Sequence, residues 1–176
     1  RLRDELAYLL ATSDAAASLR QLDELGALER VLPEVIVMKK TAQSRPHHWN
    51  VFEHTLVLVE RLEQMLEVLR GKDVRGNLPA PSHVWGDLER RLGPYRTDLT
   101  KHLATVLSDE RTALETLKLA ALLHDCGKPA TLYVEEDGHT CFFGHDRVGA
   151  EMASARARTL RFANVEAERV WTIVAN

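Results

Sequence analysis

The protein has 176 residues, of which 45% are hydrophobic and 28% are charged, and its formal net charge is −3. These values are typical of one globular domain, and they exclude an intrinsically disordered chain and a strongly basic nucleic-acid-binding arm. Cys126 and Cys141 are too few for a disulfide framework, and no stretch approaches 18 apolar residues. We therefore expect a cytoplasmic protein that does not span a membrane.

Helical periodicity dominates the first part of the chain. It predicts short helices over residues 1–10, 14–25 and 28–32. Ser13 is expected to cap the second helix, and Pro33 is expected to end the third. Residues 39–49 break the period and predict a loop. A long helix is predicted over residues 51–69, with Asn50 as its N-cap and Gly71 at its end.

The second part of the chain alternates between weaker and stronger patterns. Residues 70–109 form an excursion, with helical stretches expected over 84–92 and 95–107. Another helix is predicted over 110–125. The period then changes to two over 131–135 and 139–143, on either side of Asp137-Gly138, which is a strong hairpin signal. Two further helices are predicted, over residues 147–160 and 165–176. The predicted fold is a mostly α helical bundle with one small β-hairpin.

The first candidate for chemistry is the dipeptide His124-Asp125. An almost wholly apolar run precedes it, so both side chains are expected at the end of a buried helix. Gly127 is expected to close that helix in the left-handed conformation, and Pro129 to prevent its continuation. A buried carboxylate is costly unless a cation pairs with it, and a metal ion would do so. The alternative is a polar helix end, with Asp125 bonded to the local backbone.

Two further histidines could join this pair. His54 shares a helical stripe with Leu58 and Leu62 and should face the interior, as a ligand or as an ordinary core residue. His145 follows the hairpin; with Asp146 as the N-cap of the next helix, its imidazole is free to turn inward or to lie on the surface. Imidazole nitrogen and carboxylate oxygen suit Mg, Mn, Ni, Co or Fe, and the absence of thiolate spacing argues against a structural zinc site.

These motifs resemble a known family. His54, then His124-Asp125 followed by Gly-Lys-Pro, then Phe-x-Gly-His145, resemble the HD superfamily of metal-dependent phosphohydrolases. Residues 21–34 resemble the end of the RNA-binding region in bacterial tRNA nucleotidyltransferases and poly(A) polymerase-like proteins. Residues 47–56 resemble the opening of the HD domain fused to those enzymes. The expected domains are thus an RNA-binding tail over 1–45 and an HD domain over 46–176, with an insertion at about 70–109.

The resemblance implies roles for individual residues. His54, His124 and Asp125 would be metal ligands for a divalent cation, and His145 falls where binuclear members place a further histidine. Asp125 and Lys128 would be catalytic. Lys128 would also contact the substrate phosphate, the alternative being a cation at a helix end. His48, beside His47, is expected at the site entrance or on the surface.

The resemblance also implies a function. We expect hydrolysis of phosphate monoesters or cyclic diesters of nucleotides or tRNA ends, within a larger protein that carries a nucleotidyltransferase head upstream. The chain starts inside an amphipathic pattern and stops after an apolar run, so it is expected to be a piece of that protein. The downstream ligands usual in the family are expected beyond Asn176, and the fragment by itself could be inactive. The alternative is a non-catalytic HD-fold module that positions RNA or a partner domain.

Overall fold

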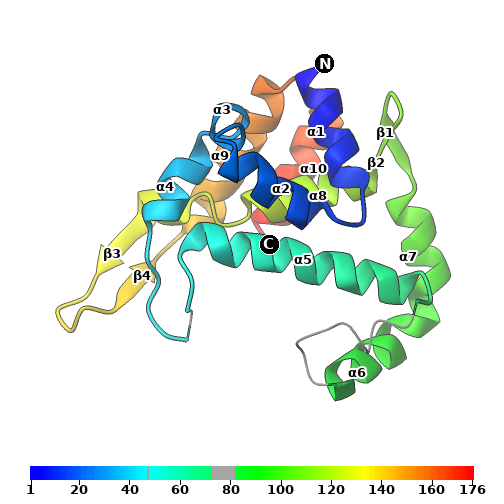
Figure 1. Ribbon diagram of the computed structural model, residues 1–176, viewed down its shortest axis with the longest axis horizontal. Helices are drawn as coiled ribbons and strands as arrows, with labels where there is room; N and C mark the ends of the chain where they lie inside the picture. Colours follow the sequence, from blue (N-terminus) through cyan, green and yellow to red (C-terminus); the bar gives the residue numbers. More distant parts are fainter. Residues whose placement is uncertain (47, 73–81) are drawn as a thin grey trace.

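The computed structural model describes residues 1–46, 48–72 and 82–176, so the expectations for His47 and for residues 73–81 lie outside the described residues. This part of the chain is mostly helical and contains two antiparallel strand pairs (Figure 1). The mostly α fold is confirmed, although the structure has two small hairpins where the sequence predicted one. In the described residues no helix is both long and apolar enough to cross a membrane.

The chain begins with a series of short helices. These are α1 (Leu2–Ala11), α2 (Ala15–Glu24), α3 (Leu28–Val31) and α4 (Glu34–Lys40). Gly26, which follows the C-cap Leu25 of α2, has a φ of +65°. The N-cap of α2 is Asp14 rather than Ser13. Helix α4 was missed because Pro33 was interpreted only as a stop, whereas proline also suits the start of a helix.

Helix α5 (Val51–Leu69) has the predicted bounds. The side chain of Asn50 accepts a hydrogen bond from the backbone N–H of Glu53, at 2.8 Å, which fixes its first turn. Its most buried positions include Phe52, Leu56, Val59, Thr55 and Glu63. The predicted stripe through His54, Leu58 and Leu62 is only half-buried. His54 therefore lies beside the buried face of α5 rather than at its centre, and it can take part in a site at the surface of the core.

The middle of the chain departs from the prediction. Helix α6 (Ser82–Leu92), the 3-10 turn η1 (Gly93–Tyr95) and α7 (Arg96–Leu103) are followed by a hairpin of β1 (Val106–Ser108) and β2 (Arg111–Thr112). The expected helix over 95–107 is therefore too long. Helix α8 (Ala113–Leu123) starts later than expected because Thr112 and Glu115 form a capping box there.

The end of the chain carries the predicted hairpin. Strands β3 (Leu132–Val134) and β4 (Thr140–Phe142) pair in antiparallel register, with Tyr133 opposite Cys141. The 3-10 turn η2 (Lys128–Thr131) precedes them, and α9 (His145–Thr159) and α10 (Asn164–Val174) follow. The N-cap of α9 is Gly144, with a φ of +70°, and not Asp146. Phe143, directly after β4, has 74% of its surface exposed.

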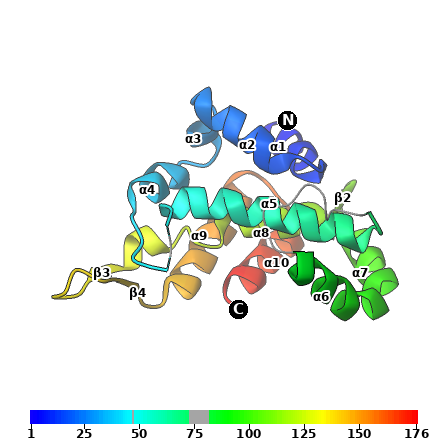
Figure 2. The same cartoon turned by 60° about the horizontal axis from the view of Figure 1, so that its bottom comes forward.

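Helix α5 organises the packing. It crosses the molecule, with α1–α3 on one side and α6, α7 and α10 on the other (Figure 2), and it contacts α2, α4 and α8. One core cluster contains buried residues from α1 to α4 together with residues of α5, α8, α9 and α10. A domain boundary at about residue 45 stays a prediction, but the hydrophobic core is continuous across that position.

A buried ion pair joins the first helices to the rest of the core. Glu63 of α5 accepts hydrogen bonds from the backbone N–H groups of Ala15, at 2.7 Å, and Ala16, at 3.4 Å. Lys118 of α8 donates to Glu63, at 2.9 Å, and to the carbonyl of Thr12, at 2.5 Å. Both charged side chains are buried. The turn between α1 and α2 is thereby fixed to α5 and α8 at once.

Replacing Lys118 by methionine should destabilise the whole chain, because Glu63 would keep a buried charge without its cation. The expected loss is about 3–5 kcal/mol in the free energy of unfolding, measured by urea denaturation. The double variant Glu63→Met/Lys118→Met removes both charges and should recover much of this loss. If the double variant instead loses as much stability as Lys118→Met and Glu63→Met combined, the pairing is contradicted.

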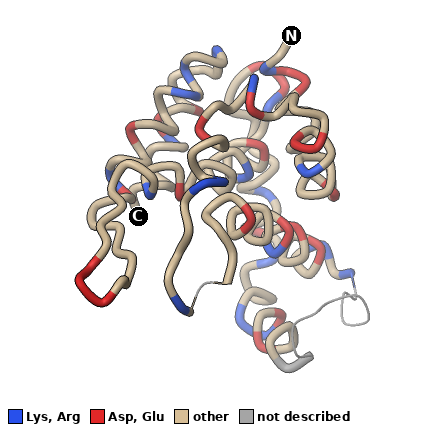
Figure 3. Tube along the Cα trace, turned by 60° about the vertical axis from the view of Figure 1, so that its left-hand side comes forward, with Lys and Arg blue, Asp and Glu red and all other residues tan. Residues whose placement is uncertain are grey.

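Charge is otherwise mixed over the surface. Lys and Arg alternate with Asp and Glu along the helices, and the tip of the β3–β4 hairpin is acidic (Figure 3). Both cysteines are free thiols, and burial raises the pKa of Cys126 to about 12.

Candidate metal centre

The end of α8 brings Asp125 into the core and leaves His124 half-buried at its edge. Leu119, Leu122 and Leu123 are fully buried on the last turns of this helix, so the residues that follow it emerge inside the protein. Asp125 is 2% exposed, which places a carboxylate where water cannot solvate it freely. This location requires compensating charge around Asp125.

Imidazole and ammonium nitrogens surround this carboxylate. Its Oδ2 lies 3.1 Å from His124 Nε2, 3.8 Å from His54 Nε2 and 2.8 Å from Lys128 Nζ. Its Oδ1 lies 3.7 Å from His145 Nε2. Residues from α5, the end of α8, η2 and the start of α9 therefore meet at one carboxylate, as the sequence predicted for the three histidines.

Two of the histidines are oriented through their second ring nitrogen. Nδ1 of His124 lies 2.8 Å from the carbonyl of Ala121, and Nδ1 of His145 lies 2.7 Å from the carbonyl of Phe142. A carbonyl can only accept, so each Nδ1 carries the proton, and in the neutral ring the lone pair is on Nε2. Both Nε2 atoms face Asp125. This is the arrangement in which a backbone acceptor orients a metal-binding histidine.

The residues fit a divalent cation. One ligand atom each from His54, His124 and Asp125 lies within 4.8 Å of the others, and these three form such a group in the described part of the chain. Asp125 Oδ2 is buried and receives no hydrogen bond of good geometry there, despite its close nitrogens. Two imidazole nitrogens and a carboxylate oxygen are a donor set that suits a first-row transition metal.

The carboxylate is ionised. Burial is the largest effect on it and raises the pKa of Asp125, but the close contacts with the imidazole of His124 and then with the ammonium of Lys128 lower the pKa and outweigh burial. The result is a pKa well below the ordinary value for aspartate. Asp125 is thus negatively charged at neutral pH.

His145 and His48 take different positions from this group. His145 is adjacent to Asp125 but is not one of the three residues whose ligand atoms lie mutually close. The ring of His48 is exposed and lies edge-on to Trp49, with a centroid distance of 6.5 Å. A ligand role for His145 and a substrate role for His48 stay predictions.

Gly127 positions the site by allowing two backbones to touch. Its φ is −79°, so the expected left-handed conformation is wrong. A Cβ at Gly127 would lie 2.3 Å from the carbonyl oxygen of His145 and 2.5 Å from the backbone nitrogen of Gly149. The absence of a side chain lets the segment after Asp125 pack directly on α9, and this contact places His145 beside Asp125.

The sequence analysis missed Gln43. Its side-chain oxygen accepts a hydrogen bond from Lys128 Nζ, at 2.7 Å, although the two residues are 85 positions apart. Lys128 is 7% exposed, and its ammonium also lies 5.5 Å from the centroid of the Phe142 ring. Lys128, which was predicted to contact the substrate phosphate, is therefore already bound by other side chains of the protein.

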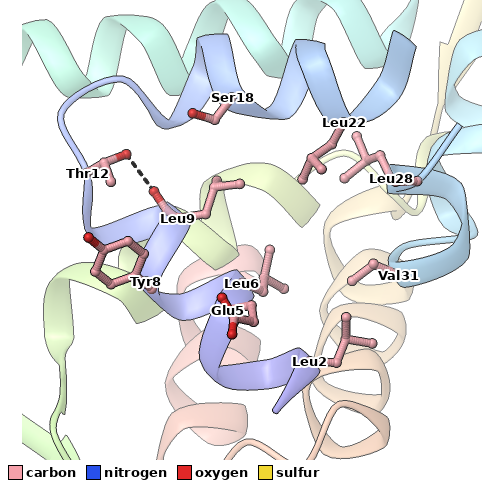
Figure 4. Close-up of a pocket in the computed structure, with 11 residues that line it drawn as sticks. Leu2, Glu5, Leu6, Tyr8, Leu9, Thr12, Ser18, Leu22, Leu28 and Val31 are labelled. Carbon is pink, nitrogen blue, oxygen red and sulfur yellow. Dashed lines mark hydrogen bonds between the residues drawn. The ribbon is translucent and has the colours of Figure 1, made fainter. Parts of the chain in front are cut away.

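The protein also has an apolar groove of about 490 Å³ between α1, α2 and α3 (Figure 4). Leucines predominate in its lining, and the Thr12 hydroxyl within it donates to the carbonyl of Leu9 at 2.7 Å. Its lining suits packing rather than acid–base or metal chemistry. The cluster around Asp125 is the stronger candidate for a reactive site.

Comparison with known proteins identifies the class. Residues 88–176, half of the chain, match the family described as HD domain, and the chain belongs to this family. Residues 1–38 match the family described as the probable RNA and SrmB-binding site of polymerase A. The HD match includes His124, Asp125 and His145, whereas His54 reaches the same cluster from outside the matched range.

Two curated relatives match nearly the whole chain. One is the A-adding tRNA nucleotidyltransferase of Deinococcus radiodurans, 31% identical over 99% of this chain. Another is the CC-adding tRNA nucleotidyltransferase of Thermus thermophilus, 33% identical over 99% of this chain. The chain spans 30% of the length of each relative.

Proposed function

We propose that His54, His124 and Asp125 bind a divalent cation and that the site hydrolyses phosphate monoesters or cyclic diesters of nucleotides or tRNA ends. The observation that carries this proposal is the buried Asp125 Oδ2, which faces the Nε2 atoms of His54 and His124 while the Lys128 ammonium pairs with it. Mg, Mn, Ni, Co and Fe are the candidate ions. Membership of the HD domain family supports the same proposal.

The chemistry follows from the groups around the carboxylate. A bound divalent cation would supply Lewis acidity, which acidifies water and polarises a phosphoryl oxygen. Asp125 would orient the attacking water through its second oxygen, Oδ1, which faces His145. Lys128 would offset the negative charge that develops on the phosphoryl oxygens. His145 is placed to hold or pass a proton at Nε2, because its Nδ1 proton is already donated to the backbone carbonyl of Phe142.

The proposed setting is a larger cytoplasmic protein with a nucleotidyltransferase head. The names of the two relatives and the RNA-binding match of residues 1–38 support an RNA 3′ end as the substrate. The alternative is an HD-fold module that positions RNA without catalysis. It is favoured by the continuous hydrophobic core, in which residues from the 1–38 segment pack together with residues of the HD fold.

Phosphate hydrolysis by the purified protein should require a divalent cation. We expect turnover of p-nitrophenyl phosphate or of 2′,3′-cyclic AMP with Mn²⁺, Ni²⁺, Co²⁺ or Mg²⁺, and loss of activity on chelation with EDTA. Product release would be followed by absorbance and by chromatography.

Controls separate the two candidate functions. His139→Ala changes an exposed histidine of the β3–β4 hairpin and should keep the parental rate, whereas His124→Ala should abolish it. Activity that survives chelation would contradict the metal-dependent mechanism. A protein that binds the ion tightly but turns over neither substrate, even when lengthened at both ends, would favour the non-catalytic module.

A further inference from the structure

Lys128 lies between two oxygen acceptors. Its ammonium is 2.8 Å from Asp125 Oδ2 on one side and 2.7 Å from Gln43 Oε1 on the other. The first acceptor is charged and belongs to the candidate metal centre. The second is neutral and comes from the loop between α4 and α5. The two acceptors together determine where this buried cation lies.

Hydrogen bonds hold Gln43 and its neighbour Ser44 in place. The Gln43 amide donates to the carbonyl of Trp49, at 3.3 Å. The neighbouring Ser44 and Thr140 of β4 exchange hydrogen bonds, from Ser44 N to Thr140 Oγ1 and from Thr140 N to Ser44 Oγ, each at 2.8 Å. Their hydroxyls are also joined, at 2.9 Å. Gln43 is therefore presented to Lys128 by a loop that is attached to the hairpin.

The geometry contains a conflict at Asp125 Oδ2. This oxygen pairs with the Lys128 ammonium and also faces His54 and His124. An ammonium and a divalent cation on one carboxylate oxygen would repel each other strongly, since both are shielded from water. A neutral acceptor on the far side of the ammonium can hold Lys128 without adding a charge that competes for the ion.

We propose that Gln43 is a positioning residue, which holds Lys128 beside Asp125 so that a divalent cation and the ammonium can share the site. This inference rests on the proposed function, because it concerns the same centre. Gln43 acts only through Lys128: it keeps the ammonium near enough to meet a substrate phosphate, and it remains as a neutral acceptor for the ammonium when an ion takes Oδ2.

The test is a double-mutant cycle on metal affinity. Mn²⁺ would be titrated into the parent, Gln43→Leu, Lys128→Met and the double variant, and free Mn²⁺ measured by electron paramagnetic resonance. Gln43→Leu should weaken Mn²⁺ binding about tenfold, because Lys128 then relies on Asp125 alone. Lys128→Met should bind Mn²⁺ at least as tightly as the parent. In the Lys128→Met background, Gln43→Leu should have no further effect.

Two outcomes of the cycle would overturn the proposal. One is a Gln43→Leu variant that binds Mn²⁺ like the parent. The other is an equal loss in both backgrounds, which would mark Gln43 as a structural residue. Gln64→Leu is the matched control, because Gln64 hydrogen-bonds to Arg61 and Glu60 within α5, and it should leave Mn²⁺ affinity unchanged.

A measurement without metal separates this inference from the proposed function. The Lys128 ammonium should give a distinct ¹⁵N signal in lysine-selective NMR of the metal-free protein, and Gln43→Leu should shift or broaden it. A parent protein that binds no Mn²⁺ would defeat the proposed function, and the NMR signal would still decide the role of Gln43. An unshifted signal in Gln43→Leu would overturn the positioning role in either case.

Discussion

Asp125→Asn should remove divalent-cation binding while leaving the helices intact. The variant keeps the shape of the side chain but loses the one negative charge in the His54–His124–Asp125 group. Loss of a group that merely supports a ligand costs 10–100-fold in metal affinity, so loss of this ligand should cost about 100-fold or more. Isothermal titration with Ni²⁺ or Mn²⁺ measures the affinity, and circular dichroism monitors the helix content.

The same assay should rank the histidines by how much metal affinity each alanine variant loses. His54→Ala and His124→Ala should approach the loss of Asp125→Asn, because both belong to the close group. His145→Ala should cost less, since His145 Nε2 faces the other carboxylate oxygen at 3.7 Å. His102→Ala alters an exposed histidine of α7 and should bind like the parent. Unchanged affinity in both Asp125→Asn and His124→Ala would show that the ion binds elsewhere.

The helices were predictable where local signals agreed with one another. Helix α5 has its expected bounds because Asn50, its apolar spacing and Gly71 all indicate the same segment. The start of α8 was misplaced because its capping signal, Thr112 with Glu115, lies inside a longer helical pattern. The hairpin of β1 and β2 is too short to produce a visible period of two. Brief elements depend on tertiary contacts that periodicity does not contain.

The candidate site was predictable to a similar degree. His124 and Asp125 stand out because a polar pair after an apolar helix needs a partner, and the structure supplies His54 and Lys128. Gln43 could not be found in this way, because a loop glutamine has no periodicity and its contact depends on the path of the chain between α4 and β4. The ligand atoms follow from residue type, whereas the groups that orient them follow from the fold.

Gly127 shows how a correct residue can be chosen for the wrong reason. The sequence pattern suggested a left-handed turn, which would make any side chain costly through backbone strain. The observed φ of −79° is open to all residues, so the requirement for glycine comes from space alone. The neighbouring backbone of α9 belongs to a segment some 20 residues away, and no local pattern reveals its approach.

Gly127→Ala should therefore destabilise the protein and weaken the site together. The new methyl group would meet the carbonyl oxygen of His145 at 2.3 Å and the nitrogen of Gly149 at 2.5 Å, and neither backbone atom can move without shifting α9. We expect a loss of about 3 kcal/mol or more, at the upper end of the usual cost of overpacking. For a domain of this size that corresponds to a fall in Tm of roughly 6–12 °C, measured by differential scanning calorimetry.

Alanine variants of two other glycines serve as comparisons for Gly127→Ala. Gly149→Ala makes a milder contact, 3.2 Å from the nitrogen of Gly127, and should cost less. Gly86→Ala has nothing within 4 Å on helix α6 and should stabilise the protein by about 0.5–1 kcal/mol. Because the clash separates His145 from Asp125, Gly127→Ala should also bind Ni²⁺ more weakly at a temperature where it is still folded. A folded Gly127→Ala variant with parental Tm and parental affinity would mean that α9 does not approach the end of α8 as closely as this structure has it.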